Sequence, residues 1–226
     1  MGEVRRVVAA FDFDGTLTAR DSLMPFLARV AGRRRLGLAL LAGAPAIALA
    51  LAGRTDRGAT KAALLARLMA GLAAGELAAQ GDAYAAELVP RLHPALLKRI
   101  DWHRGQGHEL VLVSASLGAY LEPLGSRLGF ATVLATELEV GDDARLTGHL
   151  MGLNVRGEEK LRRLEAWLGG DPRVLWVYGD SAGDSELLAA ADNPHRCRRG
   201  RIVGLRSERD GPDGREHEGG ARHSQK

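Results

Sequence analysis

The residues best suited to chemistry in this sequence are acids and a serine placed directly after apolar segments. They are Asp12 and Asp14 after residues 4–11, Ser114 after residues 109–113, and Asp180 and Asp184 after residues 173–178. If these segments are parallel strands, their carboxyl ends share the sheet edge where ligands bind in open α/β sheets. We therefore expect the five side chains to converge on one crevice.

Four carboxylates in one crevice repel one another unless a cation neutralises them. Asp12, Asp14, Asp180 and Asp184 offer oxygen ligands with no His or Cys beside them in the sequence. Such a donor set is typical of Mg²⁺, so we expect a magnesium site. From the carboxylates alone, a purely structural ion is an equal alternative.

Hydroxyl and ammonium groups shift the balance toward phosphate chemistry. Thr16, Ser114 and Lys160 are suited to binding a phosphoryl group. Asp12 is then expected to attack phosphorus and form an aspartyl-phosphate, which divides the displacement into two easier steps. Asp14 is expected to protonate the leaving alkoxide and later to accept a proton from the hydrolytic water.

The elements that must position these residues alternate along much of the chain. Apolar runs predict strands at 4–11, 109–113, 132–135 and 173–178. Helical spacing predicts helices at 94–104, 117–128, 158–168 and 185–191, with a small excursion at 139–150. This alternation implies right-handed crossovers and a parallel sheet covered on both faces. The predicted fold class is α/β, with a Rossmann-like parallel sheet core.

A long segment after the first strand departs from that alternation. From about residue 22 to 92 it consists mostly of helix-forming residues, broken at Gly53, at 71–75 and at Pro90. It predicts a small helical bundle inserted as a cap. The expected organisation is a core of residues 1–18 and 94–205, a cap of 19–93, and a disordered tail of 206–226, which has almost nothing apolar to bury.

The ordered motifs resemble those of the haloacid dehalogenase superfamily, and within it the phosphoserine-phosphatase-like branch. They fall on Asp12-Phe-Asp-Gly-Thr-Leu-Thr18, Ser114, Lys160 and Gly179-Asp-Ser-Ala-Gly-Asp184, and the resemblance covers about residues 5–200. It implies Asp12 as nucleophile, Asp14 as acid and base, and Ser114 and Lys160 on the phosphoryl group. It also implies Mg²⁺ held by Asp12, Asp180 and the backbone carbonyl of Asp14, with support from Asp184. The second acid of the first motif argues for phosphoryl chemistry rather than dehalogenation.

Substrate choice belongs to the cap. The resemblance places Asp21 where phosphoserine phosphatases carry a glutamate that reads the substrate amine. A basic residue for the substrate carboxylate is expected from Arg54, Arg57 or Lys61. The expected activity is a Mg²⁺-dependent phosphomonoester hydrolase acting on a small phosphorylated metabolite, with phosphoserine as one option. A phosphotransferase of the same fold and a non-catalytic membrane-associated binding protein are the alternatives.

Composition bounds the partners and the compartment. A net charge of +3 over 226 residues gives no reason to expect a nucleic-acid binder. Acids at Asp12 and Asp14 interrupt any export signal, and Cys197 is the only cysteine, so a reducing, cytoplasmic location is expected. The small-molecule phosphomonoester is the expected partner, and the sequence leaves the oligomeric state open.

Residues 36–53 form an uncharged stretch that begins after Arg33-Arg34-Arg35. We expect a buried pair of helices there, because the stretch is rich in Ala and Gly and contains Pro45. A lipid-contacting interfacial helix and a membrane span are alternatives, with peripheral lipid contact ranked above a stable span. His103 and His108 are expected at the surface or as capping residues, and the tryptophans in the core.

Overall fold

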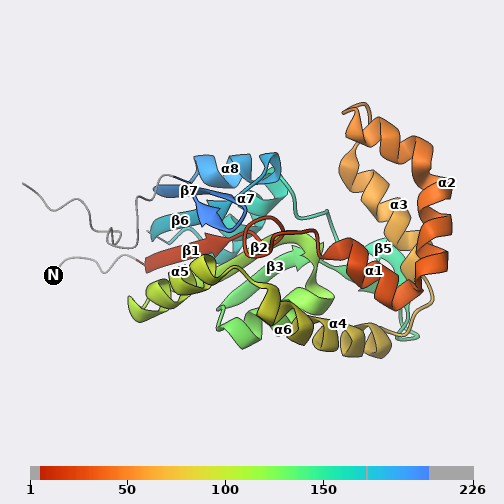
Figure 1. The fold of residues 1–226 in the computed structure, drawn as a ribbon, viewed down its shortest axis with the longest axis horizontal. Helices are drawn as coiled ribbons and strands as arrows, with labels where there is room; N and C mark the ends of the chain where they lie inside the picture. The colour runs from red at the N-terminus through yellow and green to blue at the C-terminus, as the bar shows by residue number, and fades with distance from the viewer. Residues whose placement is uncertain (1–5, 172, 204–226) are drawn as a thin grey trace, which may run out of the picture.

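The computed structural model describes residues 6–171 and 173–203 and contains a six-stranded sheet in the order β3-β2-β1-β6-β7-β8 (Figure 1). The strands are β1 (Arg6–Phe11), β2 (Glu109–Leu117), β3 (Thr132–Thr136), β6 (Arg173–Gly179), β7 (Asn193–Arg198) and β8 (Arg201–Ile202). All pairings are parallel except that of β7 with β8. The predicted α/β class with a Rossmann-like parallel sheet is therefore confirmed. The expected tail, residues 206–226, lies outside the described residues.

β1 lies at the centre of the sheet because its side chains are apolar on both faces. Ala9 and Phe11 join one hydrophobic cluster, while Val8 and Ala10 join another. The first cluster is covered by α5 (Pro94–Gly105) and α6 (Gly118–Leu128), and the second by α7 (Glu158–Leu168) and α8 (Ser185–Ala189). Such two-sided burial holds the carboxyl end of β1 rigidly at the sheet edge.

Sequence periodicity missed one parallel strand. β7 has the sequence Asn-Pro-His-Arg-Cys-Arg, and its burial is limited to Cys197 and partly buried neighbours. It pairs with β6 and is followed by the short β8, so it lies near the sheet edge. A strand in that position tolerates a proline and several charges, which removes the apolar signal.

The inserted segment folds into α1 (Leu23–Ala31), α2 (Arg33–Leu51), α3 (Arg57–Met69), α4 (Ala74–Leu88) and the short η1 (Val89–Arg91). Its breaks coincide with those predicted from Gly53, residues 71–75 and Pro90. One further break occurs at Gly32, whose φ of +82° favours glycine. Asp56 begins α3 by accepting hydrogen bonds from the amides of Gly58 and Ala59.

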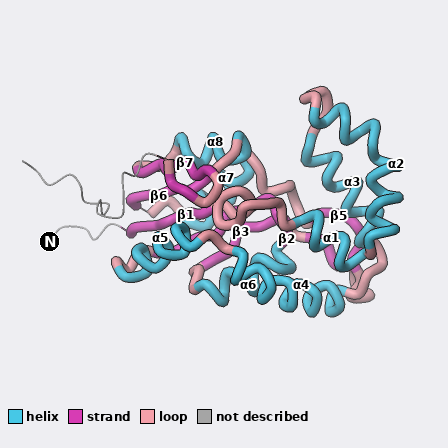
Figure 2. Tube along the Cα trace, in the orientation of Figure 1, coloured by secondary structure: helices cyan, strands magenta, loops and turns pink. Residues whose placement is uncertain are grey.

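The excursion at 139–150 is an antiparallel hairpin of β4 (Leu138–Val140) and β5 (Leu146–Leu150). It lies against α3, and Gly148 is so close that a Cβ there would be 3.2 Å from the Ala66 carbonyl oxygen. Figure 2 shows α1, α2, α3 and this hairpin grouped at one end of the molecule. We use the word cap for these four elements. α4 instead lies along α6, where a Cβ at Gly81 would meet the Ala119 carbonyl at 1.9 Å.

The expectation of a buried helix pair at 36–53 is wrong. α2 is one continuous helix with Pro45 inside it. It is the one helix among the described residues whose length and composition would allow it to cross a membrane. Its apolar window has a mean hydropathy of 1.5. Only 11% of its apolar window is buried. Burial was expected because the helix is apolar around most of its circumference. A pattern of this kind does not show which face packs against the rest of the protein and which faces solvent.

The expectation that His103 is a surface or capping residue is also wrong. Its side chain is fully buried, with Nε2 2.9 Å from the Tyr178 hydroxyl and Nδ1 2.8 Å from Nδ1 of His108. Phe11 and Trp176 lie edge-on to its ring. Burial lowers the pKa of His103 to about 3, so the imidazole is neutral in the folded protein.

We predict that His103 makes the fold sensitive to acid. The unfolded chain takes up a proton at this histidine near pH 6.5 and the folded chain only near pH 3, so the free energy of unfolding contributed by His103 falls as pH drops below 6.5. His103→Gln should therefore show a smaller loss of stability than the wild type between pH 7.5 and pH 5.5, a range that enters this window from its upper end. Urea unfolding at both pH values checks this, with exposed His149→Gln as the matched control. Equal pH dependence in the wild type and His103→Gln would contradict it.

Candidate active site

Asp12 lies immediately beyond β1 and is held by the sheet itself. Its amide donates to the Tyr178 carbonyl at 2.9 Å, and the residue is 5% exposed. Oδ1 accepts from Lys160 Nζ at 2.5 Å, and Oδ2 accepts from the Thr16 hydroxyl at 3.3 Å. Burial raises the pKa of the carboxyl to about 7, while the Lys160 ammonium acts in the opposite direction.

Lys160 joins acids from two different strand ends. It lies in the first turn of α7, with Nζ 2.5 Å from both Asp12 Oδ1 and Asp184 Oδ1. Burial favours the neutral amine, but the two carboxylates outweigh it and raise the pKa of Lys160. The side chain is therefore a permanent, buried positive charge directly beside the expected nucleophile.

A triad of acids surrounds this contact. Oxygen atoms of Asp12, Asp180 and Asp184 lie within 4.8 Å of one another. Asp184 Oδ2 accepts from the amide and hydroxyl of Ser181, both at 3.0 Å, which orients that carboxylate. Lys160 supplies one positive charge against three acids, so a further cation is needed for all three to ionise together.

The acid triad fits a hard divalent cation. Asp180 Oδ1 is buried and has no hydrogen-bond partner in the described structure, so it is free to act as a ligand. The donors of the triad are carboxylate oxygens, which suit Mg²⁺. Asp12, Asp180 and Asp184 are the residues that would hold the ion. The Asp14 carboxylate, named with them from the sequence, is not part of this triad.

The absence of a side chain at Gly15 leaves room for the Asp180 carboxylate, because a Cβ at Gly15 would lie 2.1 Å from Asp180 Oδ2. Its φ of +85° is also strained for other residues. We predict that Gly15→Ala displaces the Asp180 carboxylate and weakens divalent-cation binding by tenfold or more, since about 1.4 kcal/mol of lost interaction is tenfold in affinity. Calorimetric titration with Mg²⁺ checks this. Gly43→Ala in α2, where a Cβ has only ordinary contacts, is the control, and unchanged affinity in Gly15→Ala would refute the argument.

Asp14 has a separate environment beside the triad. Its Oδ2 accepts from the Ser116 hydroxyl at 2.5 Å, and its Oδ1 accepts from the Ser22 amide at 2.8 Å. Burial raises the pKa of Asp14, and the hydrogen bond from Ser116 partly opposes that shift. A carboxyl with a raised pKa is suited to donating a proton near neutral pH.

Sequence reasoning missed the residues that orient Asp14. The Ser22 hydroxyl lies 2.8 Å from the Tyr120 hydroxyl, and the Tyr84 hydroxyl donates to the Ser22 carbonyl at 3.0 Å. The sequence did hold a signal for Ser116, because it lies two residues after Ser114 and alternate residues of a strand point to the same face. Nothing local in the sequence links Tyr84 or Tyr120 to Asp14, because they come from α4 and α6.

The residues expected to bind phosphate face this same pocket or support it. Ser114 is buried, accepts from the Ser116 amide at 3.1 Å, and lines a cavity of about 230 Å³ together with Asp12, Asp14 and Lys160. Thr16 is buried behind Asp12, to which its hydroxyl donates. The expected convergence of strand-end residues is thus what the structure shows.

Three of the four residues considered for substrate recognition lie at the cavity. Asp21, Arg57 and Lys61 line the cavity, whereas Arg54 is not among its lining residues. Lys61 Nζ donates to the Ala115 carbonyl and, at 2.8 Å, to Asn154 Oδ1, so it joins α3 to the end of β2. Burial lowers the pKa of Lys61 to about 8.

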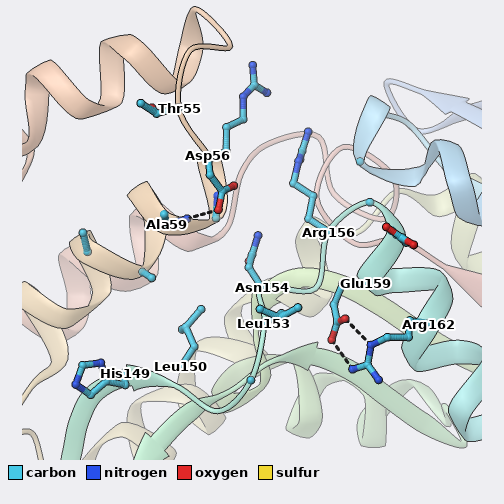
Figure 3. Close-up of a pocket in the computed structure, with 18 of the residues that line it drawn as sticks. Thr55, Asp56, Ala59, His149, Leu150, Leu153, Asn154, Arg156, Glu159 and Arg162 are labelled. Carbon is cyan, nitrogen blue, oxygen red and sulfur yellow. Dashed lines mark hydrogen bonds and ion pairs between the residues drawn. The ribbon is translucent and has the colours of Figure 1, made fainter.

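A larger cleft of about 1240 Å³ opens beside this cavity (Figure 3). Asp56, which precedes α3, and Ala59 of α3 lie on one side, and Arg156 lies across from them on the loop that leads to α7. Arg57, Asn154 and Arg156 line both spaces. The cleft therefore lies between α3 and the loop that leads to α7.

The comparisons with known proteins agree with this geometry. Residues 9–189 match the family of haloacid dehalogenase-like hydrolases. The chain belongs to this family. It is 36% identical over 187 residues to protein CicA of Caulobacter vibrioides, covering 82% of the chain and 83% of that protein. A histidinol-phosphatase of Neisseria meningitidis is 29% identical over 113 residues, covering 47% of the chain and 51% of that enzyme.

Solved structures share the fold. A Bordetella pertussis protein of unknown function has a TM-score of 0.70 and 26% identity, with 83% of this chain and 87% of that one covered. A probable phosphoserine phosphatase from Vibrio cholerae has a TM-score of 0.57 and 19% identity, with 83% and 56% covered. The expected membership of the superfamily and the phosphoserine-phosphatase-like fold are confirmed.

Proposed function

We propose that the protein is a Mg²⁺-dependent phosphomonoester hydrolase that works through an aspartyl-phosphate on Asp12. The observation that carries the proposal is the buried contact of Lys160 with both Asp12 and Asp184. Asp180 lies beside these acids, and Asp14 lines the same cavity as Asp12. The phosphatase among its sequence relatives supports this reaction type. The single buried cysteine supports a cytoplasmic location.

The first step of the proposed reaction is attack by a carboxylate oxygen of Asp12 on the phosphorus of the ester. A bond forms between that oxygen and phosphorus, the bond from phosphorus to the ester oxygen breaks, and the electron pair stays on the leaving oxygen. Asp14 gives that oxygen its proton, so the product leaves as a neutral alcohol. Ser116 and the Ser22 amide hold Asp14 in place for this transfer.

The second step hydrolyses the acyl phosphate. Asp14, now ionised, accepts a proton from a water molecule whose oxygen attacks phosphorus, and the bond to Asp12 breaks to release phosphate and restore the carboxylate. Lys160 and the Ser114 hydroxyl, which line the cavity, are proposed to bind the phosphoryl oxygens. A bound divalent cation supplies positive charge that offsets the repulsion between carboxylates and phosphate.

The proposed substrate is a small phosphorylated metabolite, because the cavity beside Asp12 holds about 230 Å³. Asp21 is suited to a substrate cation, and Arg57 and Lys61 to a substrate anion, a combination that an amino-acid phosphate such as phosphoserine would satisfy. Phosphoserine is one candidate within this class.

Phosphate release with Mg²⁺ across a substrate panel tests the proposal. The panel contains phosphoserine, phosphoethanolamine, phosphocholine, sugar phosphates, nucleotides and lysophospholipid phosphates. We expect release from at least one small member, its loss with chelator, and its recovery on adding Mg²⁺. An added alcohol that captures the phosphoryl group would show a phosphotransferase instead. Metal-independent release, or no turnover of any member, would contradict the proposal.

A further inference from the structure

The outer face of α2 is an exposed apolar stripe. Leu38, Leu41 and Leu49 are 69%, 73% and 42% exposed. With Pro45 they follow one another at spacings of three or four residues, so they lie on one side of the helix. We call these four residues the leucine stripe. Figure 1 shows α2 at the outer edge of the cap, away from the sheet.

Charge is segregated around this stripe. Residues 22–55 contain five arginines and no acid, although the whole chain is nearly balanced at +3. Three of the arginines, Arg33, Arg34 and Arg35, form the exposed first turn of α2, and Arg54 follows its end. Arg34 lies four residues before Leu38 and therefore on the same side as the leucine stripe. Arg35 donates to the backbone carbonyl of Arg67, which is a neutral partner.

We propose that this face of α2 docks on an anionic lipid bilayer. The helix would lie in the plane of the interface, with the leucine stripe at the acyl boundary and Arg33, Arg34 and Arg35 among the headgroup phosphates. Apolar area on one side and arginines at the headgroup level are the two contributions that hold an amphipathic helix at a membrane surface. The docking does not depend on catalysis, since none of these residues lines the cavity beside Asp12.

The opposite side of α2 argues against a membrane span. At about 1.5 Å per residue the 19-residue helix is just long enough to cross. However, Leu36, Ala39 and Ala50 are buried, and α2 packs along α3 and against α1. A spanning helix would have to break these contacts, whereas an interfacial helix keeps them.

The arginines argue against a second copy of the chain as the occupant. In a two-fold dimer through the leucine stripe, parallel helices would place the two Arg33–Arg35 turns side by side. Antiparallel helices would place each of those turns near the partner's Arg54. Both arrangements bring like charges together, whereas anionic headgroups supply the opposite charge.

Co-sedimentation with vesicles tests the proposal. We expect the full-length protein to bind vesicles of equal parts phosphatidylcholine and phosphatidylglycerol, and to bind pure phosphatidylcholine much more weakly. Binding should weaken as salt is raised, because surface charges are screened. The Asp12→Asn variant should bind like the wild type, which separates docking from catalysis.

Two variants, each with a matched control, locate the contact. Leu38→Gln with Leu41→Gln should lose most vesicle binding, whereas Met151→Gln with Val203→Gln, at comparably exposed apolar positions elsewhere, should not. Arg33→Gln, Arg34→Gln and Arg35→Gln together should weaken binding by about fivefold per arginine. The exposed triple change Arg198→Gln, Arg199→Gln and Arg201→Gln should have little effect. Circular dichroism confirms that each variant is folded.

Several results would overturn the proposal. They are absence of binding by the wild type, equal loss in the two arginine triples, and binding that survives alkaline carbonate extraction, which would indicate a span. A concentration-dependent dimer in sedimentation velocity that is lost in the leucine double variant would show that a second copy covers the stripe.

Discussion

Replacing Asp12 with asparagine should abolish phosphate release while leaving the fold intact. The amide cannot form the acyl phosphate, so kcat should fall by about 10⁴-fold or more, as it does when a catalytic nucleophile is removed. The amide oxygen can still accept from Lys160, and burial already disfavours the charged form of Asp12. Stability should therefore be retained.

Phosphate release and urea unfolding together check this prediction. Asp142→Asn, at an exposed acid in the β4–β5 turn, is the matched control and should behave like the wild type in both. Wild-type-like turnover by Asp12→Asn would remove Asp12 as the nucleophile. Loss of folding would instead show that the carboxylate is needed to hold the strand end.

Lys160→Met should lower both activity and stability. The ammonium lies within 2.5 Å of two buried carboxylates, and removing one partner of a buried ion pair typically lowers stability by about 3 kcal/mol or more. Loss of this charge beside the phosphoryl group should reduce kcat by roughly 10²- to 10³-fold, as for other preorganised electrostatic groups.

The destabilisation by Lys160→Met should depend on pH with a definite sign. Without Lys160, the pKa of Asp12 rises above about 7, further from its value in the unfolded chain. The folded variant then binds an extra proton as pH falls, so its free energy of unfolding recovers toward acid. Urea unfolding near pH 8 and near pH 6 checks this, with exposed Lys98→Met as the control. A larger deficit at the lower pH would contradict the proposed pairing.

The sequence predicted the core of the site because topology fixes it. Asp12, Ser114 and Asp180 follow strands, and parallel strands bring their carboxyl ends to one edge. The structure shows those residues lining one cavity or lying beside it. Their roles in catalysis remain predictions.

Other features depended on contacts distant in the sequence. The burial of His103 requires the Tyr178 hydroxyl as a partner, and the orientation of Asp14 requires Ser22 and Ser116. The burial of α2 was predicted wrongly because both of its faces are apolar, so its composition did not show which face packs against the protein. Tertiary packing decides all of these, and local patterns carry little information about it.

The most direct test of the central claim is peptide mass spectrometry after rapid acid quench during turnover of a substrate found by the panel. Asp14→Asn, which should hydrolyse the intermediate slowly, would be measured beside the wild type. We predict a phosphate on the peptide that contains Asp12, sensitive to hydroxylamine as an acyl phosphate is, and absent from Asp12→Asn. Phosphate on another residue, or turnover with no phosphorylated enzyme in either protein, would contradict the account.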